Sequence, residues 1–373
     1  MKILYISNSY IPSKTANSLH VMKMCQAFAD NGHETILVAP DRPDVTLQDV
    51  ADPFEYYNVS KSYKLQFLKS PKIGKKTVGY ICSLFNFLRK NKFDVIYSRF
   101  LIGTVISVFL RRKTIFESHD PVFRNGLIKK ILFNYISNSK KMVKIVVISE
   151  ALKKIYTRYN TTLTSKLCVA HDGSDSINDF STRVKLRGAF DFNVGYIGHL
   201  YPGKGVEVIE LVSPMCPNVG FHIIGGLEQD IDHWKSKIKQ DNVFFYGFLP
   251  QSELTKYINS LDICLLPNQH VVSVYGGGKT NISEFTSPLK MFDYMAHKKA
   301  IISSNLPVLK EVLNDTSSIL VDPEDFEGWQ KAIEQLSDDE LRNSISQKAY
   351  DDFEKKYSWK RRAKNILKEL DEY

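Results

Sequence analysis

Cysteine is scarce in this sequence, and its cysteines follow no recognised ligand or disulfide spacing. The 373 residues include five cysteines, an odd number without a C-x-x-C pair: Cys25, Cys82, Cys168, Cys216 and Cys264. This usage predicts neither a disulfide framework nor a zinc site, and it fits a reducing compartment best.

Long apolar runs are missing as well. The longest, from Phe100 to Leu110, has 11 residues, whereas a helix needs about 20 apolar residues to cross a bilayer. The N-terminal run Met1–Ser7 is short and apolar, and it predicts a first β-strand rather than a signal peptide. We therefore expect a soluble or peripheral protein of the cytoplasm.

Acidic residues are few in the first half of the chain. Residues 1–175 contain 27 Lys and Arg but 13 Asp and Glu, whereas residues 176–373 contain 23 and 28. The formal net charge of +9 thus combines a strongly basic half with a mildly acidic one. With 43% hydrophobic and 24% charged residues, the composition is that of a globular protein and excludes collagen-like and wholly disordered chains.

Short β-branched runs alternate with longer amphipathic segments, and the length predicts two domains. In the first half the predicted strands are 2–7, 34–39, 94–98, 114–117, 145–148 and 167–170. The predicted helices are 16–31, 76–90, 101–112, 127–140 and 150–159, and residues 41–75 show no clear element. This alternation indicates a parallel sheet covered on both faces.

The same alternation restarts after a polar stretch, 176–187, which we interpret as a linker. The predicted strands are 193–197, 221–224, 242–246, 262–266, 300–303 and 318–321. The predicted helices are 206–212, 229–239, 251–260, 288–297 and 308–313, and three helical segments close the chain. The predicted fold class is α/β, with two Rossmann-like domains, 1–180 and 188–358, facing each other across a ligand cleft at the carboxyl ends of the strands.

One segment combines a strand, a glycine-bearing turn and a lysine before a helix. Residues 194–205 read V-G-Y-I-G-H-L-Y-P-G-K-G. Exposed N–H groups and the helix dipole at such a turn favour an anion, and Lys204 adds a full charge. The pattern predicts a phosphate site, against the plainer alternative of a connecting loop with a solvated lysine.

A second segment, 284–296, places polar groups at the start of a helix. Ser287 suits the N-cap, and Pro288 suits the first helical position. Lys290 and Asp293 fall on one side of the helix, either as a surface ion pair or as a site where the helix start takes a phosphate and Asp293 a ribose. The apolar face of this helix is expected to be core: Leu289, Phe292 and Ala296.

These two segments resemble the donor-site motifs of the retaining, GT-B-fold glycosyltransferases of family 4 (glycosyl transferases group 1). Gly198–Gly205 is similar to the family's G-R-L-x-x-x-K-G turn, and Ser287–Ala296 to the end of its E-x7-E motif with E-A-M-A or E-Y-M-A. Further fragments agree in the same order: Asn17–His20, Ser118–Asp120, Val147–Glu150, His171–Asp175, Lys299–Ser304 and Tyr357–Trp359. The resemblance implies that a last helix, 359–373, packs back on the first domain.

The chain departs from the family motifs at several positions. His199 stands where the family has Arg, so its charge depends on pH and it lacks the bidentate fork of Arg. Asp293 replaces the second Glu of E-x7-E, and Phe285 stands in place of the first. Glu284, one residue away, is the nearest carboxylate to that first position. The usual G-G after the first strand is also absent.

The resemblance implies a division of roles between the domains. Lys204, His199 and the helix start at Ser287 are expected to stabilise the departing diphosphate, and His119 to orient the donor sugar. Asn17 and His20, at the start of the first helix, are expected to face the acceptor. The other expected donor contacts are Gly198, Gly247, Phe248, Leu249, Glu284, Leu289, Lys290 and Asp293, with Asp293 on the ribose and the main chain at 247–249 on the base.

Two further patterns carry less weight. The D-x-D at 230–232 lies beside Glu228 on a predicted helix, and it predicts a solvated acidic face. Gly276–Lys279 is glycine-rich but lacks the spacing of a phosphate loop and the helix that follows one. No nucleophilic Ser or Cys arrangement stands out. The resemblance to the family implies a reaction without a cofactor or a metal.

The basic half carries its charge in two clusters. The lysines of 61–76 lie between Glu55 and Asp94 without an intervening carboxylate, interleaved with Tyr63, Phe67 and Leu68. The second cluster runs from Arg111 to Lys144. Basic residues with apolar neighbours suit an anionic membrane surface. Nucleic acid, the rival partner, is not expected, because no nucleic-acid-binding motif accompanies the charge.

The sequence therefore predicts a retaining, metal-independent glycosyltransferase. Its donor is expected to be a nucleotide-diphosphate sugar, UDP- or GDP-linked, and its acceptor a hydroxyl of a glycan or lipid-linked saccharide, in surface polysaccharide or glycolipid biosynthesis at the inner membrane face. A nucleotide-sugar epimerase of the same fold and a non-catalytic partner subunit stay open as alternatives. An NAD enzyme ranks last, because no G-x-G-x-x-G follows the first strand.

Overall fold

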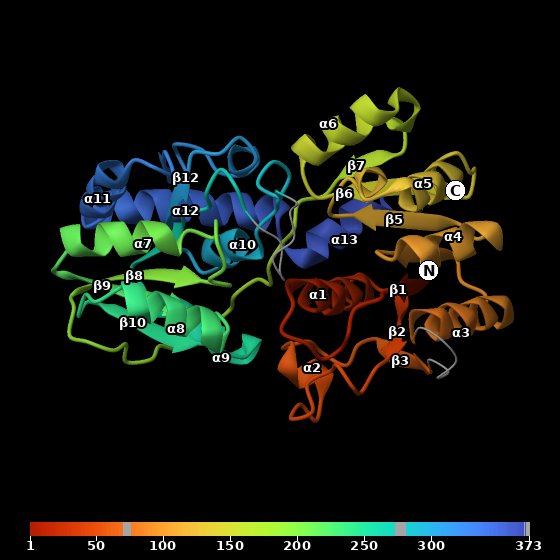
Figure 1. The fold of residues 1–373 in the computed structure, drawn as a ribbon, viewed down its shortest axis with the longest axis horizontal. Coiled ribbons are helices and arrows are strands. Elements are labelled where there is room, and N and C mark those ends of the chain that lie inside the picture. The colour runs from red at the N-terminus through yellow and green to blue at the C-terminus, as the bar shows by residue number, and fades with distance from the viewer. Residues whose placement is uncertain (70–75, 273–280, 369, 371–373) are drawn as a thin grey trace. The chain divides into compact units, whose positions relative to one another are not determined.

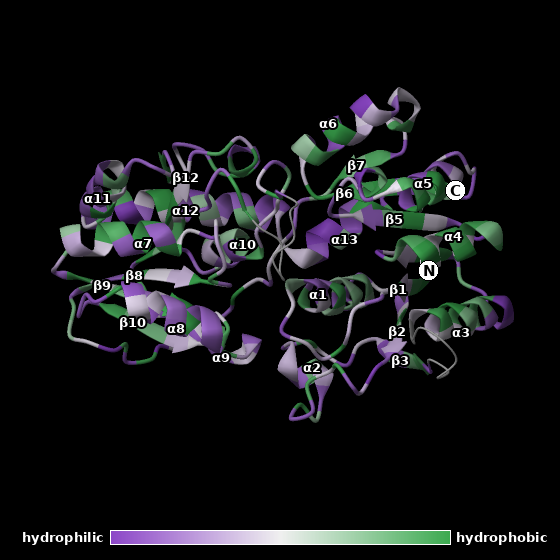
Figure 2. Cartoon of the chain, in the orientation of Figure 1, coloured by the Kyte–Doolittle hydropathy of each residue, from purple (hydrophilic) through white to green (hydrophobic). Residues whose placement is uncertain are grey.

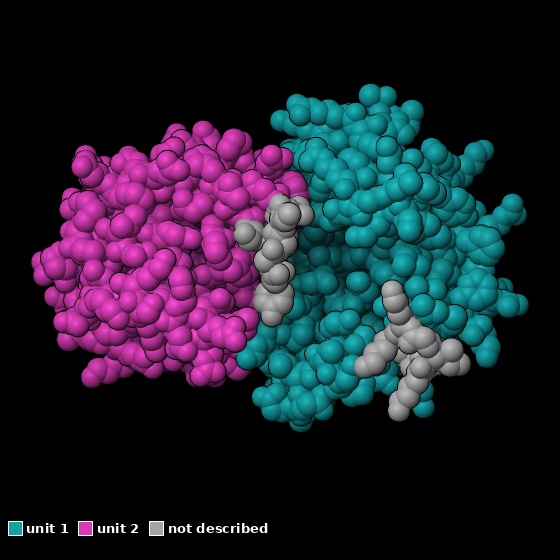
Figure 3. Space-filling model, viewed as in Figure 1, with its two compact units in different colours: residues 1–171, 359–373 teal, residues 172–358 magenta. Residues whose placement is uncertain are grey.

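The computed structural model describes residues 1–69, 76–272, 281–368 and 370. They form two compact units, coloured separately in Figure 3: Met1–His171 with Trp359–Tyr373 (unit 1), and Asp172–Ser358 (unit 2). The division follows His171 rather than residue 180, because Ser174 already pairs with Ser358 as an isolated bridge within unit 2.

The sheet of unit 1 has seven parallel strands in the order β3-β2-β1-β4-β5-β6-β7 (Figure 1). The strands are β1 (Lys2–Ile6), β2 (Glu34–Asp41), β3 (Lys64–Lys69), β4 (Val95–Ser98), β5 (Thr114–Ser118), β6 (Met142–Val147) and β7 (Leu167–Val169). The helices are α1 (Ala16–Asp30), α2 (Pro53–Tyr56), α3 (Lys76–Lys90), α4 (Leu101–Phe109), α5 (Leu127–Ser137), α6 (Glu150–Tyr159) and α13 (Trp359–Leu367), with short 3-10 turns at Val122–Arg124 and Thr161–Leu163. The strand order reverses between β1 and β4, which is where ligands bind in open α/β sheets, beyond the carboxyl ends of the strands.

The middle strands of this sheet are buried along their length, because helices cover both faces of a parallel sheet. Every residue of β4 and β5 is buried. One side of the sheet packs a cluster that includes Leu4, Val38, Leu84 and Ile96. Figure 2 shows the matching apolar character of α4, which belongs to the same layer.

The expectation that residues 41–75 hold no element is wrong, because α2 and β3 lie there. In β3, K-L-Q-F-L-K, only Leu68 is buried. The strand lies at the sheet edge and pairs with β2 alone. An edge strand with one buried residue has no apolar alternation for a sequence pattern to detect.

The sheet of unit 2 has six parallel strands in the order β10-β9-β8-β11-β12-β13. The strands are β8 (Phe192–Ile197), β9 (Val219–Ile224), β10 (Val243–Gly247), β11 (Ile263–Leu266), β12 (Ala300–Ser304) and β13 (Ile319–Val321). The helices are α7 (Val206–Val212), α8 (Glu228–Lys237), α9 (Gln251–Asn259), α10 (Leu289–Ala296), α11 (Phe326–Gln335) and α12 (Asp339–Lys356), with 3-10 turns at Ser213–Met215 and Leu309–Glu311. The strand order reverses between β8 and β11, so this unit too has a topological switch point, the place where ligands bind in open α/β sheets.

The core of unit 2 lies between its sheet and the covering helices. Its largest buried side chains include Tyr196, Phe221 and Trp329. The helix predicted at 308–313 is only the 3-10 turn Leu309–Glu311. The side chain of Asn314 accepts the Thr316 N–H and begins a turn there, which ends the helical segment early.

Candidate active site

In unit 2, the turn after β8 is shaped by glycines. Gly198 has φ +138° and Gly205 has φ +100°, values that side chains rarely adopt. A Cβ on Gly205 would lie 2.1 Å from the carbonyl oxygen of Pro267. The backbone of this turn is therefore closely packed, and it presents Lys204 just before α7.

The N–H groups of this turn are not available to an anion as the sequence suggested. The Glu207 carboxylate accepts the N–H groups of Gly203 and Gly205, both at 3.1 Å. A carboxylate in the first turn of a helix is favoured at that position. The expected anion site on the backbone of this turn is therefore wrong at these two groups.

Three basic side chains lie at this turn: His199 and Lys204 from the turn itself, and Lys290 from α10. Lys290 Nζ lies 3.7 Å from the ring centroid of Tyr196 and is buried with no hydrogen-bond partner among the described residues. A Cβ on Gly198 would lie 3.5 Å from the same Nζ. The alternative of a surface ion pair between Lys290 and Asp293 is therefore wrong, because the amine points to the β8 turn.

The electrostatics of the three groups are coupled. Burial lowers the pKa of Lys204 to about 8. Burial, and then the charge of Lys204, lower the pKa of Lys290. Burial, followed by the charges of Lys204 and Lys290, lowers the pKa of His199. Clustered, partly desolvated cations of this kind favour a ligand with more than one negative charge.

Ser287 does not cap α10. The helix begins at Leu289 after Pro288, and no side chain caps it. The Ser287 hydroxyl instead accepts the N–H of Asp172 at 2.9 Å, because the segment after His171 runs past it. The expected N-cap at Ser287 is therefore wrong, and the first N–H groups of α10 carry no side-chain cap.

The predicted ribose ligand, Asp293, lies on α10 and is half-buried. Its Oδ1 accepts the hydroxyl of Ser174 at 2.6 Å. On the same helix Leu289 is half-buried, while Phe292 and Ala296 are fully buried, as predicted for a core face.

The remaining predicted donor contacts are spread along unit 2. Gly247 ends β10, and its carbonyl accepts the Gly225 N–H at 2.7 Å; Phe248 is exposed and Leu249 half-buried. Glu284 is exposed in a turn, and Phe285 beside it is buried. Asp232 of the D-x-D is exposed on α8, as expected. Gly276–Lys279 lies outside the described residues.

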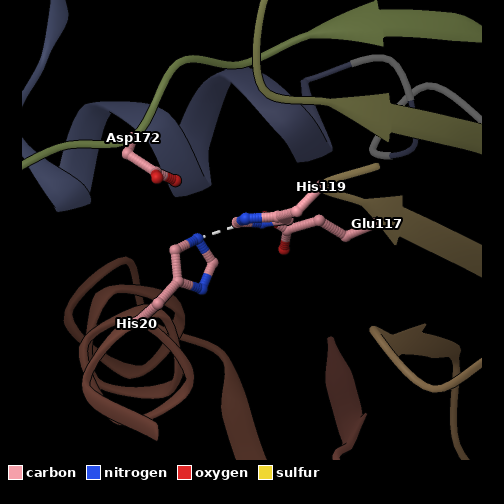
Figure 4. Close-up of side chains that lie close together, drawn as sticks. All are labelled: His20, Glu117, His119 and Asp172. Atoms are coloured by element: carbon pink, nitrogen blue, oxygen red, sulfur yellow. Dashed lines mark hydrogen bonds and ion pairs between the residues drawn. The ribbon is translucent and has the colours of Figure 1, made fainter. Parts of the chain in front are cut away.

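In unit 1, a buried carboxylate gathers several basic groups (Figure 4). Oε1 of Glu117, near the end of β5, lies 2.8 Å from His119 Nε2 and 3.1 Å from His20 Nε2. The same oxygen lies 2.7 Å from Arg362 Nη2. The hydroxyl of Tyr97 donates to the other oxygen, Oε2. Burial alone would raise the pKa of Glu117, but the charges of Arg362 and His20 outweigh it and hold that pKa well below its usual value.

Three of these residues, His20, Glu117 and His119, are of the types that ligate divalent metals, with ligand atoms within 4.8 Å of one another. Oε1 of Glu117, however, already contacts the guanidinium of Arg362 at 2.7 Å. A metal ion bound to this oxygen would lie beside a permanent positive charge. We therefore assign Glu117 to holding His119 in place.

A cavity of about 840 Å³ lies beyond the carboxyl ends of β1, β4 and β5. His119 and Asn17 line it, as do Arg99 and Asn8. Asn17 donates to the Ser9 hydroxyl at 2.7 Å, while its buried Oδ1 has no hydrogen-bond partner among the described residues. His20 is 1% exposed and does not line the cavity, so its expected contact with an acceptor is not supported.

Sequence reasoning missed Glu117 and Arg362. A detectable signal existed for Glu117, because a carboxylate inside the buried run T-I-F-E-S requires a buried partner. No signal existed for Arg362, which stands in the basic run K-R-R next to two similar residues.

Two family models match the sequence. Residues 18–176 match Glycosyltransferase Family 4, and residues 191–339 match Glycosyl transferases group 1. The matches follow one another along the chain and leave only the ends and a short middle segment uncovered. The chain belongs to this glycosyltransferase family. It is a glycosyltransferase enzyme.

Solved structures agree with the fold of this glycosyltransferase. A sucrose-phosphate synthase from Thermosynechococcus elongatus is 15% identical with a TM-score of 0.77, covering 100% of this chain and 98% of its own. HepE of Anabaena in complex with UDP-glucose is 14% identical with a TM-score of 0.73, covering 100% of both chains. A variant of S. aureus TarM with fondaparinux, α-GlcNAc-glycerol and UDP is 13% identical with a TM-score of 0.70, covering 99% of both chains.

At these identities the similarity shows the fold, which is GT-B. A comparison with curated protein sequences finds no match. Within the described ranges, no helix of this glycosyltransferase combines the length and apolar content needed to cross a membrane.

Proposed function

We propose that this glycosyltransferase moves a sugar from a nucleotide-diphosphate donor, UDP- or GDP-linked, to a hydroxyl of a glycan or lipid-linked saccharide, with retention and without a metal ion. The observation that carries the proposal is the cluster of His199, Lys204 and Lys290 at the switch point of unit 2. The complexes of HepE with UDP-glucose and of TarM with UDP support the choice of donor. We further propose a role in surface polysaccharide or glycolipid synthesis at a membrane surface.

The donor diphosphate binds between the β8 turn and the start of α10. Lys204 and Lys290 neutralise its oxygens, and His199 donates a hydrogen bond to it. The uncapped N–H groups of α10 add further donors to the same anion. Lys204 and Lys290 thereby supply the positive charge that a divalent cation supplies in metal-dependent sugar transferases, while His199, whose pKa is lowered, contributes its hydrogen bond.

The acceptor hydroxyl enters from the cavity of unit 1. The buried Oδ1 of Asn17 accepts a hydrogen bond from the acceptor. His119 orients the donor sugar, and its ring is held through Nε2 by the ionised Glu117. Arg362 and His20 act through Glu117, so they position His119 without contacting a substrate.

The transfer step forms one bond and breaks one. The acceptor oxygen attacks the anomeric carbon from the face that the diphosphate leaves, which preserves the anomeric configuration. The bond between that carbon and the diphosphate oxygen breaks, and this oxygen takes the acceptor proton. No carboxylate nucleophile is required, and the growing charge on the leaving diphosphate is what Lys204 stabilises.

Replacing Lys204 tests the assignment. Lys204→Ala is expected to lower turnover by about 10²-fold or more, the effect of removing one preorganised group from a developing anion, with an unchanged circular dichroism spectrum. Lys235→Ala, an exposed lysine of α8, is the matched control and is expected to keep wild-type turnover. Turnover in Lys204→Ala equal to that of the control would contradict the proposal that Lys204 stabilises the leaving diphosphate.

Product analysis tests the rest of the proposal. A panel of UDP- and GDP-sugars is screened by thermal shift, since a ligand that binds only the folded state raises the melting temperature. With the donor so found, the product is expected to keep the donor's anomeric configuration by NMR, and an excess of EDTA is expected to leave the rate unchanged. An altered free sugar made without acceptor would instead identify an epimerase.

A further inference from the structure

Helix α5 is apolar on two sides, and only one of them is buried. Phe133 and Ile136 are fully buried in unit 1. On the opposite side, Leu127, Ile128, Ile131 and Tyr135 are 73%, 76%, 57% and 46% exposed. At 3.6 residues per turn these four side chains share an arc of about 100°. A continuous apolar stripe on a helix is unusual on a surface that faces only water.

The surroundings of this stripe are basic. Between Asp120 and Glu150 the sequence contains no carboxylate, while it contains Arg124, Lys129, Lys130, Lys140, Lys141 and Lys144. All of these cations except Lys144 are exposed. Lys144 is buried and donates to the Ile366 carbonyl. The apolar stripe is thus flanked by positive charge that no nearby acidic residue in the sequence offsets.

The neighbouring helix extends the same surface. Helix α4 packs beside α5, and its last residue, Phe109, is 64% exposed. The chain continues from Phe109 into exposed Arg111 and Lys113. An aromatic ring and two more cations therefore add to the apolar and basic character of this part of unit 1.

The stripe is continuous with the cavity that holds His119. Leu127 and Ile128 line that cavity at the start of α5, together with Lys129 and Leu132. The side chains that begin the exposed stripe therefore also form a wall of the space beside His119 and Asn17. A molecule lying against the stripe is next to the opening of that space.

We propose that α5 docks unit 1 on an anionic lipid bilayer, with Leu127, Ile128, Ile131 and Tyr135 inserted among the lipids and the flanking cations on the headgroups. Apolar stripes flanked by lysine and arginine bind such interfaces by burial and by charge attraction together, at about 1 kcal/mol per cation near the surface. The cavity then opens toward the membrane, where a lipid-linked acceptor presents its hydroxyl. This last step rests on the proposed glycosyl transfer, whereas the docking does not.

The other basic cluster offers less apolar surface for this contact, because Phe67, 40% exposed, is the one exposed side chain among Tyr63, Phe67 and Leu68. Tyr63 and Leu68 are buried in unit 1, and Lys61 pairs with Asp52 at 2.8 Å. Lys72 and Lys75 lie outside the described residues. Of the two clusters expected from the sequence to meet a membrane, the geometry favours the one around α5.

Cosedimentation with vesicles tests the docking. The probes are vesicles of phosphatidylcholine alone and vesicles with about a third phosphatidylglycerol. The wild type is expected to bind the anionic vesicles, and Ile131→Glu/Tyr135→Glu to bind them at least about tenfold more weakly. These two residues do not line the cavity, so the variant leaves the proposed site intact.

A matched variant controls for the added charge. Leu211→Glu/Leu341→Glu places two carboxylates at exposed leucines of unit 2, 47% and 39% exposed, and is expected to bind vesicles like the wild type. The depth of insertion is measured by tryptophan fluorescence. Brominated lipid is expected to quench the fluorescence of the tryptophan in Ile128→Trp and not that of the tryptophan in Leu211→Trp. Equal vesicle binding by the wild type and Ile131→Glu/Tyr135→Glu would overturn the proposal.

Burial of the α5 stripe in a dimer of this chain would also overturn the docking proposal. If a second copy of the chain covers α5, the wild type sediments as a dimer, Ile131→Glu/Tyr135→Glu sediments as a monomer, and neither binds vesicles. Thermal shifts by UDP and by GDP on the same proteins keep the two proposals apart. Loss of vesicle binding with an unchanged nucleotide shift supports docking and leaves the donor site intact, whereas a wild type that neither UDP nor GDP stabilises contradicts the proposed function and not the docking.

Discussion

Arg362 Nη2 lies 2.7 Å from Oε1 of Glu117, although 245 positions separate the two residues. Both side chains are buried within unit 1. The same guanidinium donates to the carbonyls of Ala170 and His171. Three parts of unit 1 therefore meet at one ion pair beside His119: the last helix, the end of β5 and the segment that follows β7.

Glu117→Gln is expected to destabilise the protein by about 3 kcal/mol, because it leaves the guanidinium of Arg362 buried without a counter-charge. The measurement is urea unfolding followed by circular dichroism. Glu253→Gln removes the partner of Lys256 in a half-exposed pair on α9, and its expected cost is below about 1 kcal/mol. Similar losses in the two variants would show that the buried pair contributes no more than a surface pair.

The contribution of Glu117 to stability is expected to depend on acid pH. Burial acts to raise the pKa of Glu117, but the charges of Arg362 and His20 outweigh it, so the folded-state pKa lies well below the usual value. A carboxylate of this kind stabilises the fold fully above its unfolded pKa of about 4.3, and this stabilisation is lost as the pH falls through the folded pKa.

The measurement is the difference in unfolding free energy between the wild type and Glu117→Gln from pH 7 down to pH 3. The difference is expected to shrink below about pH 4.3. His20 and His119 contact the same carboxylate, so His20→Gln is run in parallel to separate the loss of the His20 contact from the loss of the Glu117 charge. A difference that stays constant to pH 3 contradicts the depressed pKa.

Sequence periodicity located most helices and strands, because most of them bury one continuous face. The helix predicted at 150–159 is α6, Glu150–Tyr159. The strand β3 and the short helix α2 escaped detection. In β3 a single side chain is buried, and in α2 none is. Elements held mainly by backbone pairing or by one cap leave no hydrophobic period in the sequence.

The site was predictable where local motifs carry it. Lys204 and Lys290 stand in two short segments, one after β8 and one at the start of α10, and the fold brings them close enough for the charge of Lys204 to lower the pKa of Lys290, together with burial. The contacts that make the site differ from its prediction either join distant segments or depend on the direction in which a side chain points. Glu207 folds back on Gly203 and Gly205, and Arg362 reaches Glu117 from the other end of the chain. No spacing rule encodes either contact.

Gly205→Ala is expected to cost roughly 3 kcal/mol or more, because φ of +100° is strained for alanine and the new Cβ meets the Pro267 carbonyl oxygen. Gly126→Ala is the matched control. Gly126 has a similar φ of +108°, but a Cβ there has no atom within 4 Å, so only the strain of about 1–3 kcal/mol applies. The measurement is thermal unfolding, and equal losses in the two variants would contradict the tight packing of the β8 turn.

Binding of UDP is expected to draw protons from solution. Burial lowers the pKa of Lys204 to about 8, and burial with the charge of Lys204 lowers the pKa of Lys290. A bound diphosphate favours the charged form of both amines and raises both pKa values. At pH 8 the phosphates of UDP are already ionised, since the second phosphate pKa is about 6. Lys204 alone should then take up about half a proton at pH 8, and Lys290 should add to it.

Calorimetry in HEPES and in Tris at pH 8 measures this uptake, because the observed enthalpy changes with the ionisation enthalpy of the buffer. Lys290→Met is expected to reduce the dependence on buffer, and Lys235→Met, an exposed lysine of α8, to leave it unchanged. Lys204→Arg keeps a charge that does not titrate near pH 8. This variant should therefore lose the contribution of Lys204 to proton uptake while it retains affinity for UDP. Binding enthalpies that are the same in both buffers for the wild type would mean that neither amine meets the diphosphate.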